Sequence, residues 1–251
     1  MSNLSGKTTI VVGASRGLGE GIAAAFADAG AQVVAVSRTP TTSREPTGGP
    51  GSIQPEIADA ADATAPAGLL DRHDPEVVVL VAGATPHMRA LQQHTWETFS
   101  VNWETDVRIA FHWLREALLK PLRPGSRVVV FSSGAALNPN GSPLSGGYAG
   151  AKQTQRFITG YAQGEAKRAG LDITFTTVLP QFAPQTGVGR PAVQAYADQA
   201  GLSVEDFLRQ QPFTLLTPAT AGTAVVELVQ ADADTVAPAY LLNGAGLQKL
   251  D

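Results

Sequence analysis

The chain has 251 residues, of which 43% are hydrophobic and 16% charged, and its formal net charge is −4. This acidic balance argues against a nucleic-acid binder, because phosphate backbones attract basic surfaces. The absence of cysteine excludes disulfides, thiolate nucleophiles and cysteine-based zinc sites, and it suits a reducing compartment.

The hydropathy pattern predicts a cytoplasmic protein without a membrane partner. The first residues run into an apolar strand at Thr8 and lack the pattern of a signal peptide. No apolar run approaches the ~18 residues that a membrane span requires. We also predict no metal, because the histidines show no ligand spacing: they are His73, His87, His94 and His112.

Apolar, β-branched runs alternate with longer helical segments along the chain. We expect strands at 8–12, 32–37, 76–83, 126–133, 171–180 and 238–244. Between them, we expect a helix ending near residue 29, a long helix from about 95 to 119, and a helix that carries Tyr148. The strands are apolar throughout rather than alternating, which is typical of a parallel sheet covered on both faces.

This order predicts an α/β fold: a single doubly wound Rossmann-type parallel sheet with helices on both faces, in one domain over residues 1–251. The segment from about 181 to 217 breaks the rhythm with Pro, Gly and Gln. Because it follows the carboxyl end of a strand, we expect it to form a lid on the substrate side.

Three glycines lie between the first strand and its helix, in "VVGASRGLGEG". Gly13 allows a tight turn, Gly17 lets the backbone approach a pyrophosphate, and Gly19 leaves room for close packing of helix on strand. The spacing G-x-x-x-G-x-G differs from G-x-G-x-x-G, so taken alone it also fits a plain turn between strand and helix.

The end of the second strand favours NADP(H) as cofactor. An acidic residue there would hold the ribose hydroxyls of NAD, but this chain has Ser37 followed by Arg38. A guanidinium can bind a 2′-phosphate with two parallel hydrogen bonds, and Arg16 in the glycine loop supplies a second cation. Asp59 can accept from the adenine amino group or cap a helix.

Tyr148 and Lys152 are four residues apart in "SGGYAGAK", so a helix places them on one face. A free phenol ionises only well above neutral pH. An ammonium ~4 Å away stabilises the phenolate by about 4 kcal/mol at an effective dielectric of ~20. The pair therefore predicts general acid–base catalysis. Ser133, at the end of "VVVFSS", is placed to orient a substrate oxygen, and Asn102 to hold a water that links Lys152 to solvent.

These motifs together resemble the short-chain dehydrogenase/reductase family over nearly the whole chain. "GASRGLG" is similar to its cofactor loop, "YAGAK" to its Tyr-x-x-x-Lys, and "FSS" to its serine-bearing strand end. "VNWETDV" resembles the helix of its asparagine, and "YLLNGAGL" its C-terminal strand and turn.

The resemblance implies NADP(H)-dependent carbonyl/alcohol chemistry in a homotetramer or homodimer. It assigns catalysis to Tyr148, Lys152, Ser133 and Asn102. It implies that the cofactor is bound by Gly13, Ser15, Arg16, Gly17, Leu18, Gly19, Ser37, Arg38, Asp59, Ala60, Ala82, Gly83, Tyr148, Lys152, Pro180 and Thr186.

The chain departs from the family pattern at three places. At the end of the expected strand 76–83, "LVAG" (80–83) stands where the family has Asn-Asn-Ala-Gly. Apolar packing must therefore replace the polar contacts of the two asparagines. Pro-Gln replaces Pro-Gly at 180–181, and the loop between Ser133 and Tyr148 is about two residues longer, so it must bulge outward.

Two other functions fit the same sequence: a catalytically idle NADP(H)-binding sensor or scaffold, and an epimerase or dehydratase of the same fold. For the substrate, we expect a hydrophobic or aromatic carbonyl compound. The expected pocket residues are His87, Met88, Trp103, Phe182 and the segment 196–213.

Overall fold

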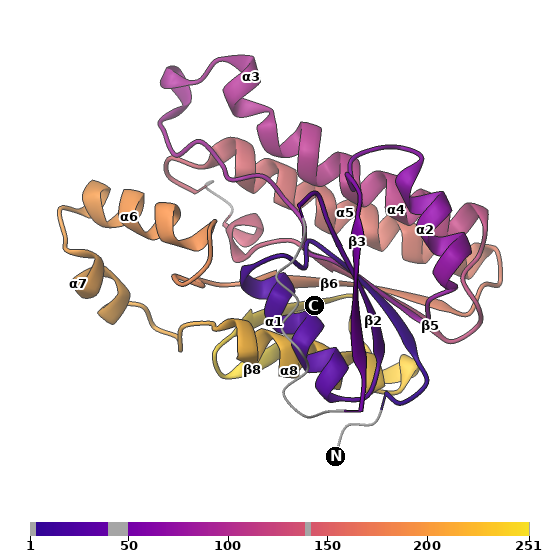
Figure 1. Ribbon diagram of the computed structural model, residues 1–251. Helices are drawn as coiled ribbons and strands as arrows, with labels where there is room; N and C mark the ends of the chain where they lie inside the picture. The colour runs from indigo at the N-terminus through magenta and orange to yellow at the C-terminus, as the bar shows by residue number, and fades with distance from the viewer. Residues whose placement is uncertain (1–3, 40–49, 139–141, 251) are drawn as a thin grey trace.

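The computed structural model describes residues 4–39, 50–138 and 142–250. Within them, one sheet has the strand order β3-β2-β1-β4-β5-β6-β7-β8 (Figure 1). All neighbours are parallel except β7 and β8. The strands are β1 (Thr8–Val12), β2 (Gln32–Ser37), β3 (Ser52–Ile57), β4 (Val77–Leu80), β5 (Ser126–Phe131), β6 (Ile173–Pro180), β7 (Ala239–Asn243) and β8 (Gly246–Leu250).

Helices cover both faces of this sheet, as predicted (Figure 1). One hydrophobic core lies under α1 (Gly17–Asp28) and α8 (Pro218–Gln230). The other lies under α2 (Ala65–His73), α4 (Arg108–Leu119) and α5 (Gly146–Arg168). The central strands β1, β4 and β5 supply buried residues to both cores, which explains why their sequences are apolar throughout.

The strands predicted from the sequence do not include β3 and β8. Both lie at the edges of the sheet, where burial on two sides is not required. β3 consists only of exposed and half-buried residues. It contains Pro55, which an edge strand tolerates because one side of its backbone needs no partner. Edge strands therefore lack the apolar run by which the other strands were recognised.

The expectation of one long helix from 95 to 119 was wrong. The segment forms α3 (Trp96–Phe99), then a π-helical turn at Trp103–Val107, then α4. A π-helical turn inserts an extra residue into the helical repeat and is often found at functional sites. Here it carries Asp106, whose carboxylate contacts Lys152 on the neighbouring helix α5.

The segment 181–217 carries two helices, α6 (Gly189–Ala200) and α7 (Val204–Arg209). They project from one side of the sheet, beyond the carboxyl end of β6 (Figure 1). Among the described helices, none has both the length and the apolar character needed to cross a membrane.

The stability of the α4 face can be tested with one residue type at two positions. Leu114 is buried at 4% exposure, whereas Leu119 on the same helix is 61% exposed. We expect Leu114→Ala to lower the free energy of unfolding by about 2–5 kcal/mol, because it leaves a cavity in the core. Leu119→Ala should cost less than about 1 kcal/mol in the same chemical denaturation experiment. Equal losses would contradict this packing.

Candidate active site

A cavity of about 1090 Å³ opens at the carboxyl ends of the parallel strands. It extends from the glycine loop after β1, past Tyr148 and Lys152, to the segment that carries α6 and α7. β1 has β2 on one side and β4 on the other, so successive crossovers leave it in opposite directions. Open α/β sheets bind ligands at such a switch point.

The glycine loop packs too tightly for side chains at two positions. Gly13 has φ +94°, and a Cβ on it would lie 2.6 Å from the backbone nitrogen of Ala82. A Cβ on Gly19 would lie 2.1 Å from the carbonyl oxygen of Gly13. Gly13 thus brings the loop against the segment after β4, and Gly19 brings the start of α1 against the loop.

The first turn of α1 has no side-chain cap. Its N-cap residue, Arg16, makes no capping hydrogen bond, and its side chain lies at the surface and lines the cavity. Backbone amides at an uncapped helix N-terminus attract anions, because amide dipoles and free N–H groups point outward. Together with the glycine cradle, this end of the cavity fits the pyrophosphate of a dinucleotide.

The ends of β2 and β3 supply the polar groups expected at the adenosine side. The buried Ser37 hydroxyl donates to the carbonyl of Thr39 at 2.6 Å, and Arg38 beside it is exposed. The Asp59 carboxylate accepts from the backbone N–H of Ala61 at 3.0 Å, so it shapes a local turn. Ser37, Arg38 and Asp59 all line the cavity.

Tyr148 and Lys152 lie on the first two turns of α5, on the face toward the cavity. The Lys152 ammonium is 5.5 Å from the centroid of the Tyr148 ring. Tyr148 is half-buried, whereas Lys152 is 5% exposed. The i, i+4 spacing in the sequence therefore becomes a phenol at the cavity wall with a buried ammonium behind it.

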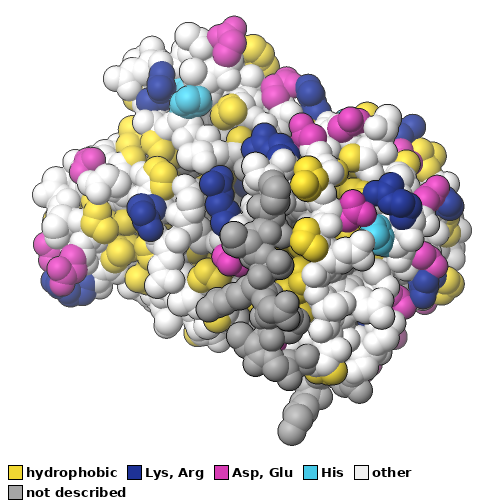
Figure 2. All heavy atoms as spheres, in the orientation of Figure 1, with side chains coloured by type: hydrophobic (Ala, Val, Ile, Leu, Met, Phe, Trp, Pro, Cys, Tyr) yellow, Lys and Arg dark blue, Asp and Glu magenta, His cyan; other side chains and the backbone are white. Residues whose placement is uncertain are grey.

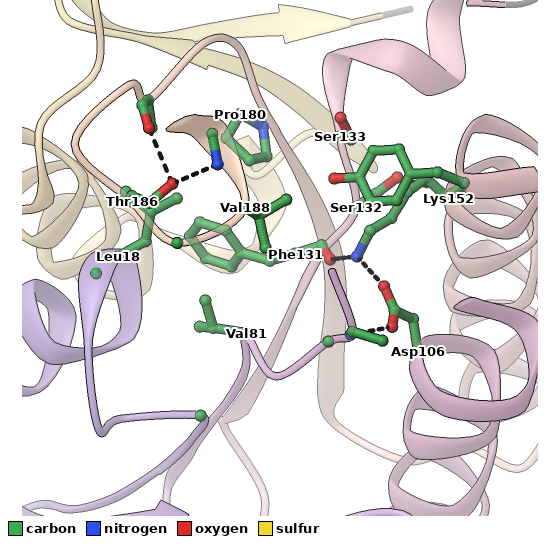
Figure 3. Close-up of a pocket in the computed structure, with 18 of the residues that line it drawn as sticks. Leu18, Val81, Asp106, Phe131, Ser132, Ser133, Lys152, Pro180, Thr186 and Val188 are labelled. Atoms are coloured by element: carbon green, nitrogen blue, oxygen red, sulfur yellow. Dashed lines mark hydrogen bonds and ion pairs between the residues drawn. The ribbon is translucent and has the colours of Figure 1, made fainter. Parts of the chain in front are cut away.

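Two serines follow β5 and have different partners. The Ser132 hydroxyl donates to the carbonyl of Lys152 at 2.7 Å, which ties the strand end to α5. Ser133 caps a 3₁₀ helix, Gly134–Leu137, by accepting from the N–H of Ala135 at 3.2 Å. Both serines line the cavity, and Figure 3 shows Ser132 closer to Lys152. The hydroxyl proton of Ser133 has no acceptor in this contact, so it can be donated to a substrate oxygen.

Three protein acceptors surround the Lys152 ammonium. Its Nζ lies 3.0 Å from Oδ2 of Asp106 and 3.3 Å from the carbonyl oxygen of Phe131 (Figure 3). It also lies 2.8 Å from Oε1 of Gln155. An ammonium has three N–H groups. All three are engaged within the protein, so Lys152 must exchange one of these contacts to bind a cofactor ribose.

Asp106, which was not among the predicted site residues, lies beside Lys152. Asn102 lies one turn earlier, buried, and its amide donates to the carbonyl of Ala84 at 2.8 Å and to Asp106 Oδ2 at 3.3 Å. Asn102 does not line the cavity, whereas Asp106 does. Its proposed water link to Lys152 remains a prediction.

The charge of Lys152 is stabilised despite its burial. Burial disfavours the ammonium, but attraction to Asp106 and Tyr148 and the hydrogen bond to Asp106 outweigh that cost and raise the pKa of Lys152. Lys152 therefore stays charged through the neutral range.

The structure accommodates two departures from the family pattern, at residues 80–81 by apolar packing and at Gln181 by a hydrogen bond between two side-chain amides. Leu80 is 2% exposed in one core, and Val81 packs against the other. Gln181 accepts from the amide of Asn243 on β7 at 3.1 Å, which anchors the backbone beside Pro180. Of the longer loop after Ser133, residues 139–141 lie outside the described residues, so its outward bulge stays a prediction.

Thr186 faces the glycine loop. A Cβ on Gly17 would lie 3.4 Å from the Thr186 side chain. The Thr186 hydroxyl donates to the carbonyl of Ala183 and accepts from the N–H of Gly189, both at 2.9 Å (Figure 3). Thr186 thus closes the turn that leads into α6, and it lines the cavity with Pro180.

Aromatic side chains line the far end of the cavity. Phe182 lies 5.7–6.2 Å, between ring centroids, from Tyr196, Phe207 and Phe213. The Tyr196 hydroxyl also contacts the hydroxyls of Ser142 and Ser145, at 2.5 and 2.7 Å. Figure 2 shows hydrophobic side chains gathered on the side of α6 and α7.

Three residues expected at this pocket do not line the cavity: His87, Met88 and Trp103. The predicted cofactor residues do line it, together with Tyr148, Lys152 and Ser133. Two contributors to the site, Asp106 and Gln155, were missed. An acid on the buried stripe that continues through Ile109 and Trp113 was the available indication for Asp106, because such a stripe is normally apolar.

Comparison with known proteins identifies the family. The model of the short chain dehydrogenase family matches residues 7–196. The chain therefore belongs to the short chain dehydrogenases, a family of oxidoreductases that bind NAD or NADP. Among curated proteins, none matches the chain by sequence.

Two solved structures share the fold. A short chain dehydrogenase from Mycobacterium avium superposes with a TM-score of 0.74 at 22% identity, over 99% of this chain and 86% of the other. A short chain dehydrogenase from Burkholderia cenocepacia J2315, in complex with NADP, gives a TM-score of 0.71 at 20% identity, over 93% and 88% of the two chains.

Proposed function

We propose that the protein is an NADP(H)-dependent oxidoreductase that interconverts a ketone or aldehyde with an alcohol, with Tyr148 as general acid and base. The observation that carries this proposal is the position of Tyr148 and charged Lys152. Both residues line the cavity, between the glycine loop that fits a dinucleotide and the aromatic side chains around Phe182.

The side chains divide the work of carbonyl reduction. NADPH bound in this cavity would supply the hydride for the carbonyl carbon. The Ser133 hydroxyl donates to the carbonyl oxygen and fixes its direction, and the Tyr148 hydroxyl gives its proton to that oxygen. In alcohol oxidation, the same phenol takes the proton back. Lys152 supports the anionic form of Tyr148 through its charge.

NADP(H) is the proposed cofactor because of the charges at the adenosine end. Arg16 and Arg38 are exposed and line the cavity there, and Ser37 stands where an acid would repel a 2′-phosphate. The Burkholderia cenocepacia structure of this fold contains NADP, which is consistent with the proposal.

The substrate end suits a neutral, apolar carbonyl compound. Phe182, Tyr196, Phe207 and Phe213 line it, and the charged side chains among the described lining residues lie toward the cofactor or on Asp106 and Lys152. An uncharged aromatic wall binds by burial of apolar surface. We propose that α6 and α7 act as the lid of this pocket.

We expect Tyr148→Phe to reduce NADPH oxidation with a panel of ketones, aldehydes and quinones by about 100-fold or more. The ring stays, so NADPH should still bind and quench or shift protein fluorescence. Tyr161→Phe is the matched control, because Tyr161 lies on the same helix and is 58% exposed. Full turnover in Tyr148→Phe would rule out its role. A wild type that binds NADPH but reduces nothing would favour the sensor function.

The cofactor preference is tested by charge reversal. Arg38→Asp should lower the ratio of kcat/KM for NADPH over NADH by about tenfold or more, because a carboxylate repels the 2′-phosphate. Arg168→Asp is the control, because Arg168 lies at the end of α5 that is far from Tyr148. This variant should leave the ratio unchanged. An unaltered ratio in Arg38→Asp would count against the phosphate contact.

We also propose that the protein is a homodimer or homotetramer. Phe111 on α4 and Phe157 on α5 are 53% and 71% exposed, which is unusual for large apolar side chains unless a partner covers them. Analytical ultracentrifugation should give two or four times the 26.0 kDa chain mass. A mass of one chain at micromolar concentration would refute this proposal.

A further inference from the structure

The Lys152 ammonium is paired with a buried carboxylate rather than left as an isolated cation. Asp106 is 1% exposed, and Figure 3 shows it reaching toward Lys152 from the neighbouring helical segment. Its contacts all come from N–H donors: Oδ2 faces Lys152 and the amide of Asn102, and Oδ1 accepts from the N–H of Ala84 at 2.8 Å. This environment suits a carboxylate rather than a carboxylic acid.

The surrounding structure holds Asp106 in this place. It lies in the π-helical turn, and its backbone carbonyl accepts from the side-chain amide of Gln155 at 2.9 Å. The same Gln155 receives a hydrogen bond from Lys152, so one amide bridges both members of the pair. A Cβ on Gly83 would lie 2.8 Å from Oδ2 of Asp106, so only glycine leaves room for the carboxylate.

The charged groups near Tyr148 are therefore a balanced pair. Lys152 faces it from α5, and Asp106 stands behind Lys152 from the preceding helix. The lining from β5 and from the segment after β6 is uncharged there: Ser132, Ser133, Gln181, Phe182 and Tyr196. Arg16, Arg38 and Asp59 line the other end of the cavity, with the glycine loop and the ends of β2 and β3.

We propose that Asp106 is a positioning residue that holds Lys152 and offsets its charge, so that the site favours the phenolate of Tyr148 less than Lys152 alone would. A lone ammonium would favour the phenolate strongly, whereas a carboxylate–ammonium pair favours it much less. A protonated phenol is the form that can donate to a carbonyl oxygen. Resting on the proposed function, this predicts that the negative charge of Asp106 favours carbonyl reduction, and that its removal moves alcohol oxidation to lower pH.

The test measures the phenolate directly and needs no substrate. The near-ultraviolet absorbance of the phenolate is followed against pH, and Tyr148 is isolated as the difference between the parent protein and its Tyr148→Phe variant. The wild-type titration is the reference curve against which each variant is compared.

Asp106→Asn keeps the size of the side chain but removes its negative charge. Because that charge opposes loss of the phenol proton, we expect the phenolate of Tyr148 to appear about one pH unit lower or more. The control is Glu104→Gln, the same chemical change two residues earlier, on a side chain that is 57% exposed and pairs with Arg108. An unshifted titration in folded Asp106→Asn would overturn the proposal.

Gln155→Glu provides the opposite change and remains informative if Asp106→Asn does not fold. It adds a carboxylate next to the Lys152 ammonium, so we expect the phenolate to appear at higher pH. A shift to lower pH, or none, would contradict the proposed charge balance. Because the titration is independent of turnover, a failed carbonyl screen would refute the proposed function while leaving these results to decide the role of Asp106.

Discussion

The contact between Lys152 and Asp106 is the interaction on which the candidate active site depends. Their charged atoms lie 3.0 Å apart, and both side chains are almost fully buried. An ammonium without a counter-ion at this depth would be costly, since burial penalises charge. Asp106 makes a charged Lys152 possible there, and Lys152 in turn stands behind the phenol at the cavity wall.

Three local features of the fold bring Lys152 and Asp106 together. A π-helical turn presents Asp106 to α5, Gly83 leaves space for its carboxylate, and Gln155 bridges the pair. None of Gly83, Asp106 and Gln155 belongs to the two large hydrophobic cores. A π-helical turn is an irregularity that is common at functional sites.

The cavity at the carboxyl ends of the strands has two chemically different ends. At the cofactor end, backbone amides and exposed arginines attract phosphate, and glycines let the ligand approach. At the opposite end, Phe182 and its aromatic neighbours from the segment 181–217 form an apolar wall. Tyr196 joins this wall to the start of α5 through Ser142 and Ser145, so the proposed lid contacts the segment that leads directly to Tyr148.

The sequence alone determined the class of fold and most of the cavity lining. Apolar strands, the glycine loop and Tyr148 with Lys152 are local patterns, and local patterns are readable because strand and helix periodicity place them. The edge strands β3 and β8 were not predicted, because edge strands are less buried and lack a continuous apolar run. Asp106 was not predicted as a site residue, because the sequence does not reveal the π-helical turn that presents it to α5. The pairing of Lys152 with Asp106 and Gln155 joins residues across two helices. Only the tertiary structure could decide it, since the distance between two helix faces is set by packing rather than by spacing along the chain.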